Sequence, residues 1–140
     1  MRAAAIDLGK VRVGLAVADE LGLFAHPRRY LDGGDPGRLV EMLARLAAEE
    51  GIEVFVVGLP RSLSGEEGPS ARRARQFAQR LERRTGLRVE LVDERLTTKE
   101  AMSRLRDQNL DGRQARERVD SAAAAILLQS WLDAHRPENS

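Results

Sequence analysis

A run of apolar residues near the middle of the chain, VFVVG at positions 54–58, places the strongest limit on the fold. It has the length of a β-strand and shows no alternation of polar and apolar side chains, so both faces of this strand are expected to be buried. Such a strand belongs in the centre of a parallel sheet covered by helices on each side. The chain is therefore expected to fold as an α/β protein. The loop at 59–68 follows the carboxyl end of this strand, where α/β sheets usually bind ligands.

The N-terminal segment predicts two further strands joined by a tight turn. Residues 3–6 are apolar, and residues 11–18 alternate between the two faces of a strand. Asp7 and Gly9 lie at the turn between them. Residues 23–31 predict a third strand, irregular because Pro27 lacks the N–H of a sheet hydrogen bond. Short turns between three consecutive strands indicate an antiparallel meander.

Helices alternate with strands in the rest of the chain. Asp35 is expected to cap a helix that begins at Pro36, runs to Glu50 and ends at Gly51. We expect a helix at 69–85 and a strand at 89–92. A short helix capped by Thr97 or Thr98 is expected to run to residue 106, and a last helix is expected at 114–134. This order fits a single domain over residues 1–140, with a mixed sheet of about five strands flanked by helices.

The composition excludes several kinds of site. The chain has no Cys and only two His residues. Cys nucleophiles, thiolate metal ligands and disulfides are thereby excluded, and a His-rich zinc site or a Ser-His-Asp hydrolase is not expected. Metal chemistry would have to use oxygen ligands, which favour Mg²⁺ or Mn²⁺. Since no apolar run approaches the ~20 residues of a membrane span and the N-terminus has no signal-peptide pattern, a cytoplasmic protein without membrane contact is expected.

Basic charge is concentrated in the second half of the chain. Residues 72–118 hold fourteen Lys or Arg and eight Asp or Glu, a net charge of +6, whereas the whole chain has a net charge of +1. This asymmetry is compatible with an anionic partner such as nucleic acid. The alternative is a solvated helical surface in a chain that favours arginine, because 21 of its 23 basic residues are Arg.

Acidic residues occur at three positions that packing alone does not explain. Asp7 ends the first strand, Asp93 and Glu94 follow the strand at 89–92, and Asp120 lies in the apolar last helix. An ionised carboxylate costs several kcal/mol to bury unless it is paired or binds a metal. Turn formation is the alternative for Asp7. Attraction to a helix dipole is the alternative for Asp120, but it fits poorly if the helix already starts at residue 114. Together the three positions predict converging carboxylates that hold one or two Mg²⁺ or Mn²⁺ ions for phosphodiester hydrolysis.

Four sequence blocks resemble the hallmark motifs of the YqgF/RuvX family. In chain order they are DLGKVRVGLAVAD from residue 7, VVGLPRSLSGEEG from residue 56, VDERLTTKEA from residue 92 and DSAAAAILLQSWL from residue 120. Members of this family are described as Holliday junction resolvases or as pre-16S rRNA nucleases. The resemblance covers nearly the whole chain and implies an RNase H-like fold close to that of the resolvase RuvC. It also implies a metal-dependent nuclease that processes the 5′ end of pre-16S rRNA.

The resemblance further implies the roles of single residues. Asp7, Glu94 and Asp120 are the implied catalytic and metal-ligating residues, with Asp93 as an alternative to Glu94. The expected contacts to nucleic acid come from basic and hydroxyl side chains in or beside the motifs: Arg12, Arg61, Ser64, Arg72, Arg73, Arg95, Thr97 and Thr98. Because aromatic residues are few, we expect recognition of backbone and shape rather than base stacking.

Other functions stay open at this stage. Asp7, Gly9 and Gly14 also resemble the first phosphate loop of the actin, sugar-kinase and Hsp70 fold, but that fold needs two lobes and a longer chain. A non-catalytic nucleic-acid-binding protein in transcription or ribosome maturation would use the same basic surface without requiring three carboxylates. RNA and branched DNA are both open as partners. A junction resolvase normally needs a two-fold dimer; a monomer or weak homodimer is expected here.

Overall fold

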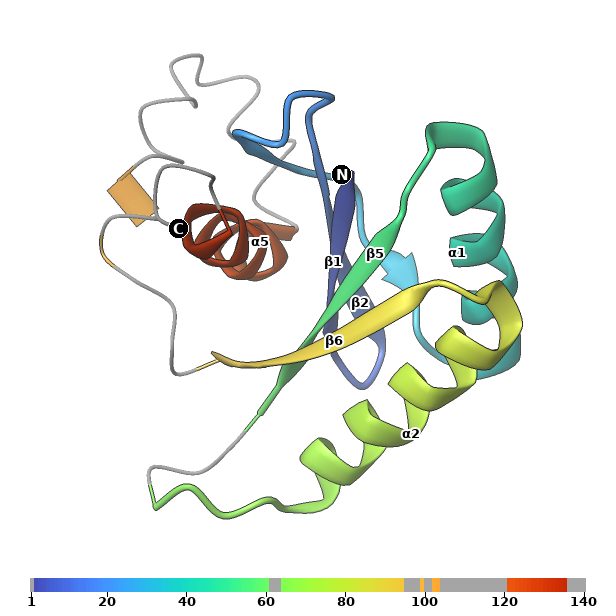
Figure 1. The fold of residues 1–140 in the computed structure, drawn as a ribbon. Coiled ribbons are helices and arrows are strands. Elements are labelled where there is room, and N and C mark those ends of the chain that lie inside the picture. The colour runs from blue at the N-terminus through green and yellow to red at the C-terminus, as the bar shows by residue number, and fades with distance from the viewer. Residues whose placement is uncertain (1, 61–63, 95–98, 100–101, 104–120, 136–140) are drawn as a thin grey trace.

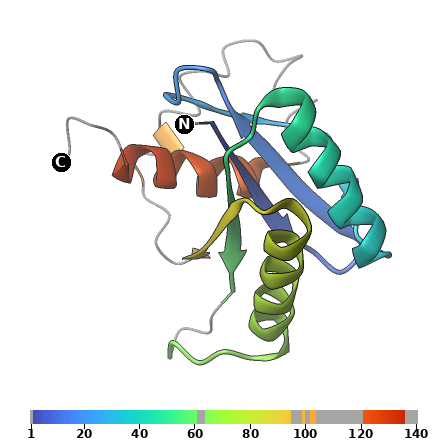
Figure 2. The same cartoon turned by 45° about the vertical axis from the view of Figure 1, so that its right-hand side comes forward.

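The computed structural model describes residues 2–60, 64–94, 99, 102–103 and 121–135. Within these residues, six strands form one mixed sheet, and helices lie against both of its faces (Figure 1). Figure 2 shows α1 (Pro36–Glu50) and α2 (Pro69–Thr85) on one side of the sheet and α5 (Ala122–Ala134) on the other. The expected mixed sheet flanked by helices is confirmed, with six strands in place of about five.

The central strand lies where its apolar sequence predicts it. β5 (Val54–Leu59) is buried at every residue. It pairs in parallel with β1 (Ala3–Leu8) on one side and with β6 (Arg88–Asp93) on the other. The carboxyl ends of these three strands therefore meet at one edge of the sheet. This edge carries Asp7 and Glu94.

The antiparallel part of the sheet differs from the prediction in its outer strand. β2 (Arg12–Ala18) pairs antiparallel with β1, as expected. The single strand expected at 23–31 is wrong, because two short strands, β3 (Ala25–Pro27) and β4 (Leu31–Asp32), pair with opposite ends of β2. β3 ends at Pro27, and the next residue, Arg28, still donates its backbone N–H to the Leu15 carbonyl of β2 at 2.8 Å.

The first two helices have the predicted ends. The Asp35 carboxylate caps α1 by accepting hydrogen bonds from the backbone N–H groups of Gly37 and Arg38, at 3.0 and 3.2 Å. Gly51 and Gly86 end α1 and α2 in the left-handed conformation, each with φ of 70°. Glycine adopts this conformation without the steric cost that a Cβ brings, which is why both ends could be predicted.

Two apolar layers fill the space between the sheet and its helices. Phe55, Phe77 and Leu81 belong to the layer under α1 and α2. The layer under α5 is built of small strand residues, such as Ala3, Ala5 and Ala16, against large helix residues that include Leu128 and Trp131. The small side chains let α5 approach the sheet closely. The apolar stripe of α5 is thus part of the core and is not free to form a dimer.

The start of the last helix corrects the prediction. α5 begins at Ala122, and Ser121 is its N-cap, whereas an uninterrupted helix from Gln114 was expected. The Ser121 side chain is buried and accepts a hydrogen bond from the backbone N–H of Leu15 at 3.0 Å.

Some predictions lie outside the described residues. They are the short helix as far as residue 106 and the first part of the last helix, at 114–120. Among the described residues, no helix has the length and apolar character needed to span a membrane.

Candidate active site

Asp7 lies near the end of β1, opposite a glycine. The register of β1 and β2 pairs Asp7 with Gly14. A Cβ built on Gly14 would lie 3.5 Å from the Asp7 Cβ, 3.4 Å from the Ala124 Cβ and 3.8 Å from the Ser121 Cα. Because Gly14 has no side chain, the first turn of α5 comes within van der Waals distance of the sheet beside Asp7.

Glu94 follows β6 and reaches across the end of β5. A Cβ built on Gly58 of β5 would lie 2.7 Å from the Glu94 Oε1 atom and 3.2 Å from the Leu127 Cδ2 atom. Since β5 separates β1 from β6 in the sheet, the missing side chain at Gly58 leaves the space that Glu94 occupies. Glycine inside a strand often marks such a close approach.

Asp7 and Glu94 share a hydrogen bond that changes the acidity of Glu94. Burial raises the pKa of Glu94 from its ordinary value of 4.5 to about 7, and the hydrogen bond to Asp7 and the charges of Asp7 and Asp93 act in the same direction. Below about pH 7 the Glu94 carboxyl keeps its proton, which it donates in the hydrogen bond to Asp7. A proton held between two carboxylates marks a place where a cation is favourable.

A cavity of about 230 Å³ opens in front of this pair. Its lining consists of Asp7, Glu94, Ala123, Ile126 and Leu127. Of the two adjoining acidic residues, Glu94 lines the cavity and Asp93 does not. Two carboxylates against an apolar helix face provide hard oxygen ligands in a partly dry setting, which suits Mg²⁺ or Mn²⁺.

The third implied carboxylate, Asp120, lies outside the described residues. Within them, no group of three or more His, Cys, Asp or Glu side chains is placed to hold a metal ion. The part of the site that the structure describes is thus a two-carboxylate site. Ser121, which follows Asp120 in the chain, lies beside Gly14 and hence beside Asp7.

The predicted nucleic-acid contacts fall in different places. Arg73 comes near the site, because its Nη2 donates a hydrogen bond to the Gly9 carbonyl at 2.8 Å, in the turn after Asp7. Arg12 lies at the exposed start of β2, and its guanidinium carbon is 5.5 Å from the centre of the Tyr30 ring. Arg72 is exposed on α2, and Ser64 is exposed before it. Four of the predicted residues lie outside the described part of the chain: Arg61, Arg95, Thr97 and Thr98.

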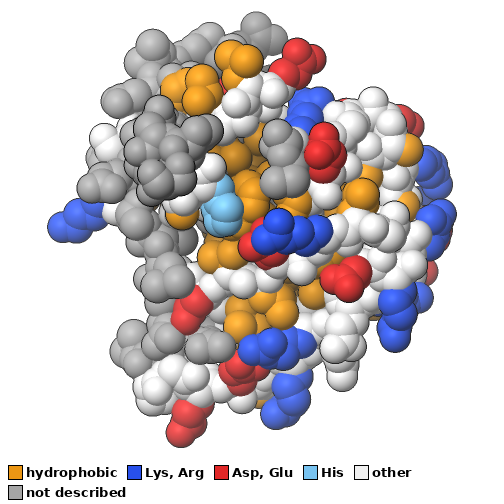
Figure 3. Space-filling view, viewed as in Figure 1, with side chains coloured by type: hydrophobic (Ala, Val, Ile, Leu, Met, Phe, Trp, Pro, Cys, Tyr) orange, Lys and Arg blue, Asp and Glu red, His pale blue; other side chains and the backbone are white. Residues whose placement is uncertain are grey.

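Ion pairs neutralise part of the basic surface. On the face shown in Figure 3, Lys and Arg side chains over α1 and α2 are interspersed with Asp and Glu. Arg75 forms two hydrogen bonds with Glu67, at 2.6 and 2.7 Å, and Arg84 pairs in the same way with Glu41. Both pairs are exposed and contribute little stability. They show that net charge along the sequence overstates the cations free to meet an anionic partner.

Sequence reasoning did not predict how two glycines, Gly14 and Gly58, and the serine Ser121 shape the site by packing. Gly14 and Gly58 each stand alone among the larger residues of a strand, and such a glycine indicates that another part of the chain packs closely against the strand there. Ser121 carries no comparable signal, because its partner Leu15 is 106 positions away in the chain.

Comparisons with known proteins agree with this architecture. The family model described as "RuvX: Holliday junction resolvase" matches residues 1–134. A relative from Anaeromyxobacter sp. (strain K), named "Putative pre-16S rRNA nuclease", is 47% identical over 137 residues, which are 98% of this chain and 100% of the relative. A relative of the same name from Myxococcus xanthus (strain DK1622) is 39% identical over 140 residues, which are 100% of this chain and 93% of the relative.

Two solved structures share the fold. T. thermophilus RuvC in complex with Holliday junction substrate has a TM-score of 0.60 and 16% identity, covering 95% of each chain. The fowlpox virus Holliday junction resolvase has a TM-score of 0.57 and 13% identity, covering 96% of this chain and 99% of the other. At these identities the likeness shows the fold alone, and it confirms the RNase H-like, RuvC-like fold expected from the sequence motifs.

Proposed function

Because the chain belongs to the RuvX family, whose model matches residues 1–134, we propose that it is a nuclease that hydrolyses phosphodiester bonds in structured nucleic acid. We propose as its substrate the 5′ end of pre-16S rRNA, in the cytoplasm, since relatives that are 39% and 47% identical carry the name of that activity. The observation that carries the proposal is the hydrogen-bonded Asp7–Glu94 pair at the carboxyl edge of the sheet.

The site residues fit a divalent cation. Asp7 and Glu94 would hold Mg²⁺ or Mn²⁺, with Asp120 proposed as a third ligand because its neighbour Ser121 lies beside the pair. When bound, such ions lower the pKa of water and neutralise charge on the leaving oxygen of a phosphodiester. Glu94 must release its proton before it can serve as a ligand. Ala123, Ile126 and Leu127 form the apolar part of the cavity lining beside the pair.

Arginine side chains would position the substrate. Arg73 is held by the Gly9 carbonyl in the turn that follows Asp7, and its remaining donors would be available to a strand that crosses this edge of the sheet. Arg12 lies on the same hairpin, at the start of β2. Contacts of this kind fix the register of a nucleic acid without reading its sequence.

Cleavage of three labelled substrates tests the proposal: a single-stranded RNA, an RNA that carries the 5′ precursor end of 16S rRNA, and a four-way DNA junction. Each is incubated with Mn²⁺ or with EDTA. Asp7→Asn is compared with Glu49→Gln, which removes an exposed acidic charge on α1. We expect Mn²⁺-dependent cleavage of the precursor RNA that is lost in Asp7→Asn and kept in Glu49→Gln.

A second candidate, Holliday junction resolution, is favoured by the RuvC-like fold with its TM-score of 0.60. Preferential cleavage of the junction, together with a two-fold dimer in solution, would select it over rRNA processing. Binding without cleavage of every substrate would overturn the nuclease proposal and favour a non-catalytic protein. Cleavage that survives Asp7→Asn would show that the site is elsewhere.

A further inference from the structure

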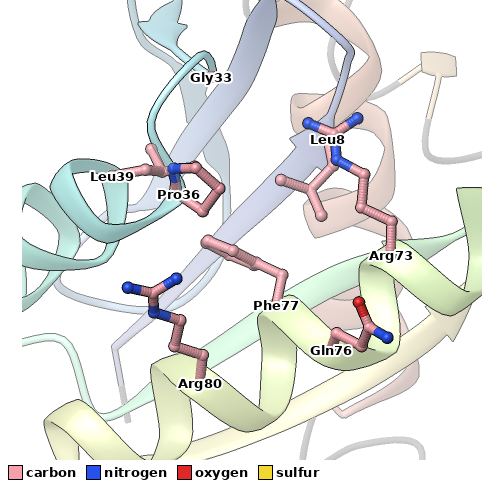
Figure 4. Close-up of a pocket in the computed structure, with 8 residues that line it drawn as sticks. All are labelled: Leu8, Gly33, Pro36, Leu39, Arg73, Gln76, Phe77 and Arg80. Carbon is pink, nitrogen blue, oxygen red and sulfur yellow. The ribbon is translucent and has the colours of Figure 1, made fainter.

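A pocket of about 170 Å³ lies between α1 and α2, on the other face of the sheet from α5. Its lining is drawn in Figure 4 and consists of Leu8, Gly33, Pro36, Leu39, Arg73, Gln76, Phe77 and Arg80. Leu8 directly follows Asp7 in β1, and successive side chains of a strand point to opposite faces. The pocket therefore adjoins the Asp7–Glu94 pair across the same edge of the sheet.

The pocket combines an apolar wall with two cations. Phe77 projects from α2 toward Pro36, between Arg73 and Arg80 (Figure 4). Phe77 is only 6% exposed and belongs to the apolar core between the sheet and α1 and α2. The two arginines are two helical turns apart on α2, and Gln76 adds an amide between them. No Asp or Glu is among the residues that line the pocket.

The two guanidinium groups are held in different ways. One N–H of Arg73 is bound to the Gly9 carbonyl, which fixes the group and leaves its other donors available. Arg80 lies over the first turn of α1, with its Nη2 2.9 Å from the point that a Cβ on Gly37 would occupy. Within the described part of the chain, Arg80 makes no hydrogen bond or ion pair. The nearby Asp35 carboxylate already accepts the N–H groups that begin α1.

We propose that this pocket binds a backbone phosphate of the same nucleic-acid strand that is cleaved at Asp7 and Glu94, an inference that rests on the proposed function. Guanidinium groups bind phosphate oxygens through paired, charge-assisted hydrogen bonds. The apolar wall suits the sugar that follows the phosphate. The volume is below the ~300–1,000 Å³ of sites that enclose a whole small-molecule ligand, which favours a phosphate with its adjoining sugar over a free nucleotide.

Binding measured in EDTA tests the proposal independently of cleavage. Fluorescence anisotropy gives the affinity of a labelled single-stranded RNA and of a labelled four-way DNA junction over a range of salt concentrations. The variants are Arg80→Ala, which removes a cation, and Gln76→Glu, which places a carboxylate in the pocket at constant size. Arg83→Ala is the matched control, because it removes an exposed arginine of the same helix that does not line the pocket. Inorganic phosphate and a 5′-mononucleotide are added as competitors.

We expect Arg80→Ala and Gln76→Glu each to weaken binding of at least one nucleic acid about tenfold. The slope of log affinity against log salt concentration should fall by about 1 in Arg80→Ala and stay unchanged in Arg83→Ala. Equal affinities in Arg80→Ala and Arg83→Ala would overturn the proposal. Displacement of the RNA by micromolar mononucleotide would also overturn it, in favour of a free nucleotide. If these variants behave as expected but cleavage is never found, only the proposed nuclease activity fails.

Discussion

The Oε1 atom of Glu94 lies 2.7 Å from the point that a Cβ on Gly58 would occupy. Gly58 belongs to β5, the strand between the one that carries Asp7 and the one that precedes Glu94. The absence of one side chain therefore lets two carboxyl groups from non-adjacent strands form a hydrogen bond. On the α5 side, Leu127 closes the same space, with its Cδ2 atom 3.2 Å from that point.

Gly58→Ala should separate Glu94 from Asp7. The new methyl group cannot coexist with Glu94 at 2.7 Å, so Glu94 or Leu127 must move. We expect the free energy of unfolding to fall by about 1–3 kcal/mol, as in other overpacked cores. A displacement of about 1 Å at the site should reduce cleavage about 100-fold. Urea unfolding and a cleavage assay measure the two effects.

Gly68→Ala is the control for this substitution. Gly68 precedes α2 with a φ of −97°, and no atom lies within 4 Å of the point that a Cβ on this residue would occupy. Because Gly68 is the N-cap of α2, where glycine is preferred to alanine, the substitution should lower stability by no more than about 1 kcal/mol and leave cleavage unchanged. Full cleavage activity in Gly58→Ala would show that Glu94 does not need its present position.

The raised pKa of Glu94 predicts a pH dependence of stability. Between pH 4.5 and about 7, the folded chain keeps a proton on Glu94 that the unfolded chain has lost. The unfolded state thus binds fewer protons in this window, and the contribution of Glu94 to the free energy of unfolding falls as the pH rises, then levels off above about pH 7. Hydrogen bonds to arginine partners lower the pKa values of Glu41 and Glu50. The contribution of these two residues to stability is therefore lost as the pH falls below 4.5, which is the opposite direction.

Urea unfolding of the metal-free protein at several pH values measures this effect. The difference between wild type and Glu94→Gln isolates Glu94, because every other titrating group is shared. We expect the stability of wild type relative to Glu94→Gln to decline from pH 4.5 to about 7. A difference that does not change with pH would show that Glu94 keeps an ordinary pKa.

Mn²⁺ should stabilise the folded protein more at high pH. A cation competes with the proton on Glu94, so the rise in Tm on adding Mn²⁺ should be larger at about pH 8 than at about pH 6. Glu94→Gln and Asp7→Asn should both lose most of this rise, and Glu49→Gln should keep it. An equal rise in all variants would place the bound ion elsewhere on the surface.

Ser121→Ala should loosen the start of α5. The substitution leaves the buried N–H of Leu15 without the acceptor that it now has at 3.0 Å. An unpaired buried N–H costs about 1–3 kcal/mol, which urea unfolding measures. Because Ser121 packs beside Gly14 and Asp7, cleavage should fall as well. Ser70→Ala, at an exposed position of α2, should leave both the stability and the cleavage activity unchanged.

Elements set by nearby residues can be predicted from the sequence, and those set by distant residues cannot. Asp35, Gly51 and Gly86 determine the helix ends through contacts within their own turns, and all three lie where the sequence predicts them. Ser121, the N-cap of α5, is held by a hydrogen bond from Leu15 of β2, and a contact between such distant residues could not be predicted from the sequence.

The same distinction applies to the candidate site. Parallel strand order brings Asp7 and Glu94 to one edge, so their proximity follows from topology. Their hydrogen bond depends on Gly58, which only the three-dimensional register places between them. The pairing of Arg75 with Glu67 likewise depends on how the loop before α2 folds, and this fold cannot be predicted from the composition.

Gln129→Leu should detach the edge strand β3 from α5. Gln129 is fully buried; its Oε1 accepts the N–H of Ala25 at 2.9 Å, and its Nε2 donates to the Leu23 carbonyl at 2.9 Å and to Asp133 at 3.1 Å. Leucine has similar volume but leaves the Ala25 N–H unpaired, so the free energy of unfolding should fall by about 2–4 kcal/mol. Hydrogen exchange at the Ala25 amide should accelerate by more than the global loss of stability allows. Gln79→Leu makes the same change at an exposed position of α2 and should alter neither the free energy of unfolding nor the exchange rate at Ala25. Unchanged exchange at Ala25 in Gln129→Leu would mean that β3 is held to β2 by its sheet hydrogen bonds alone.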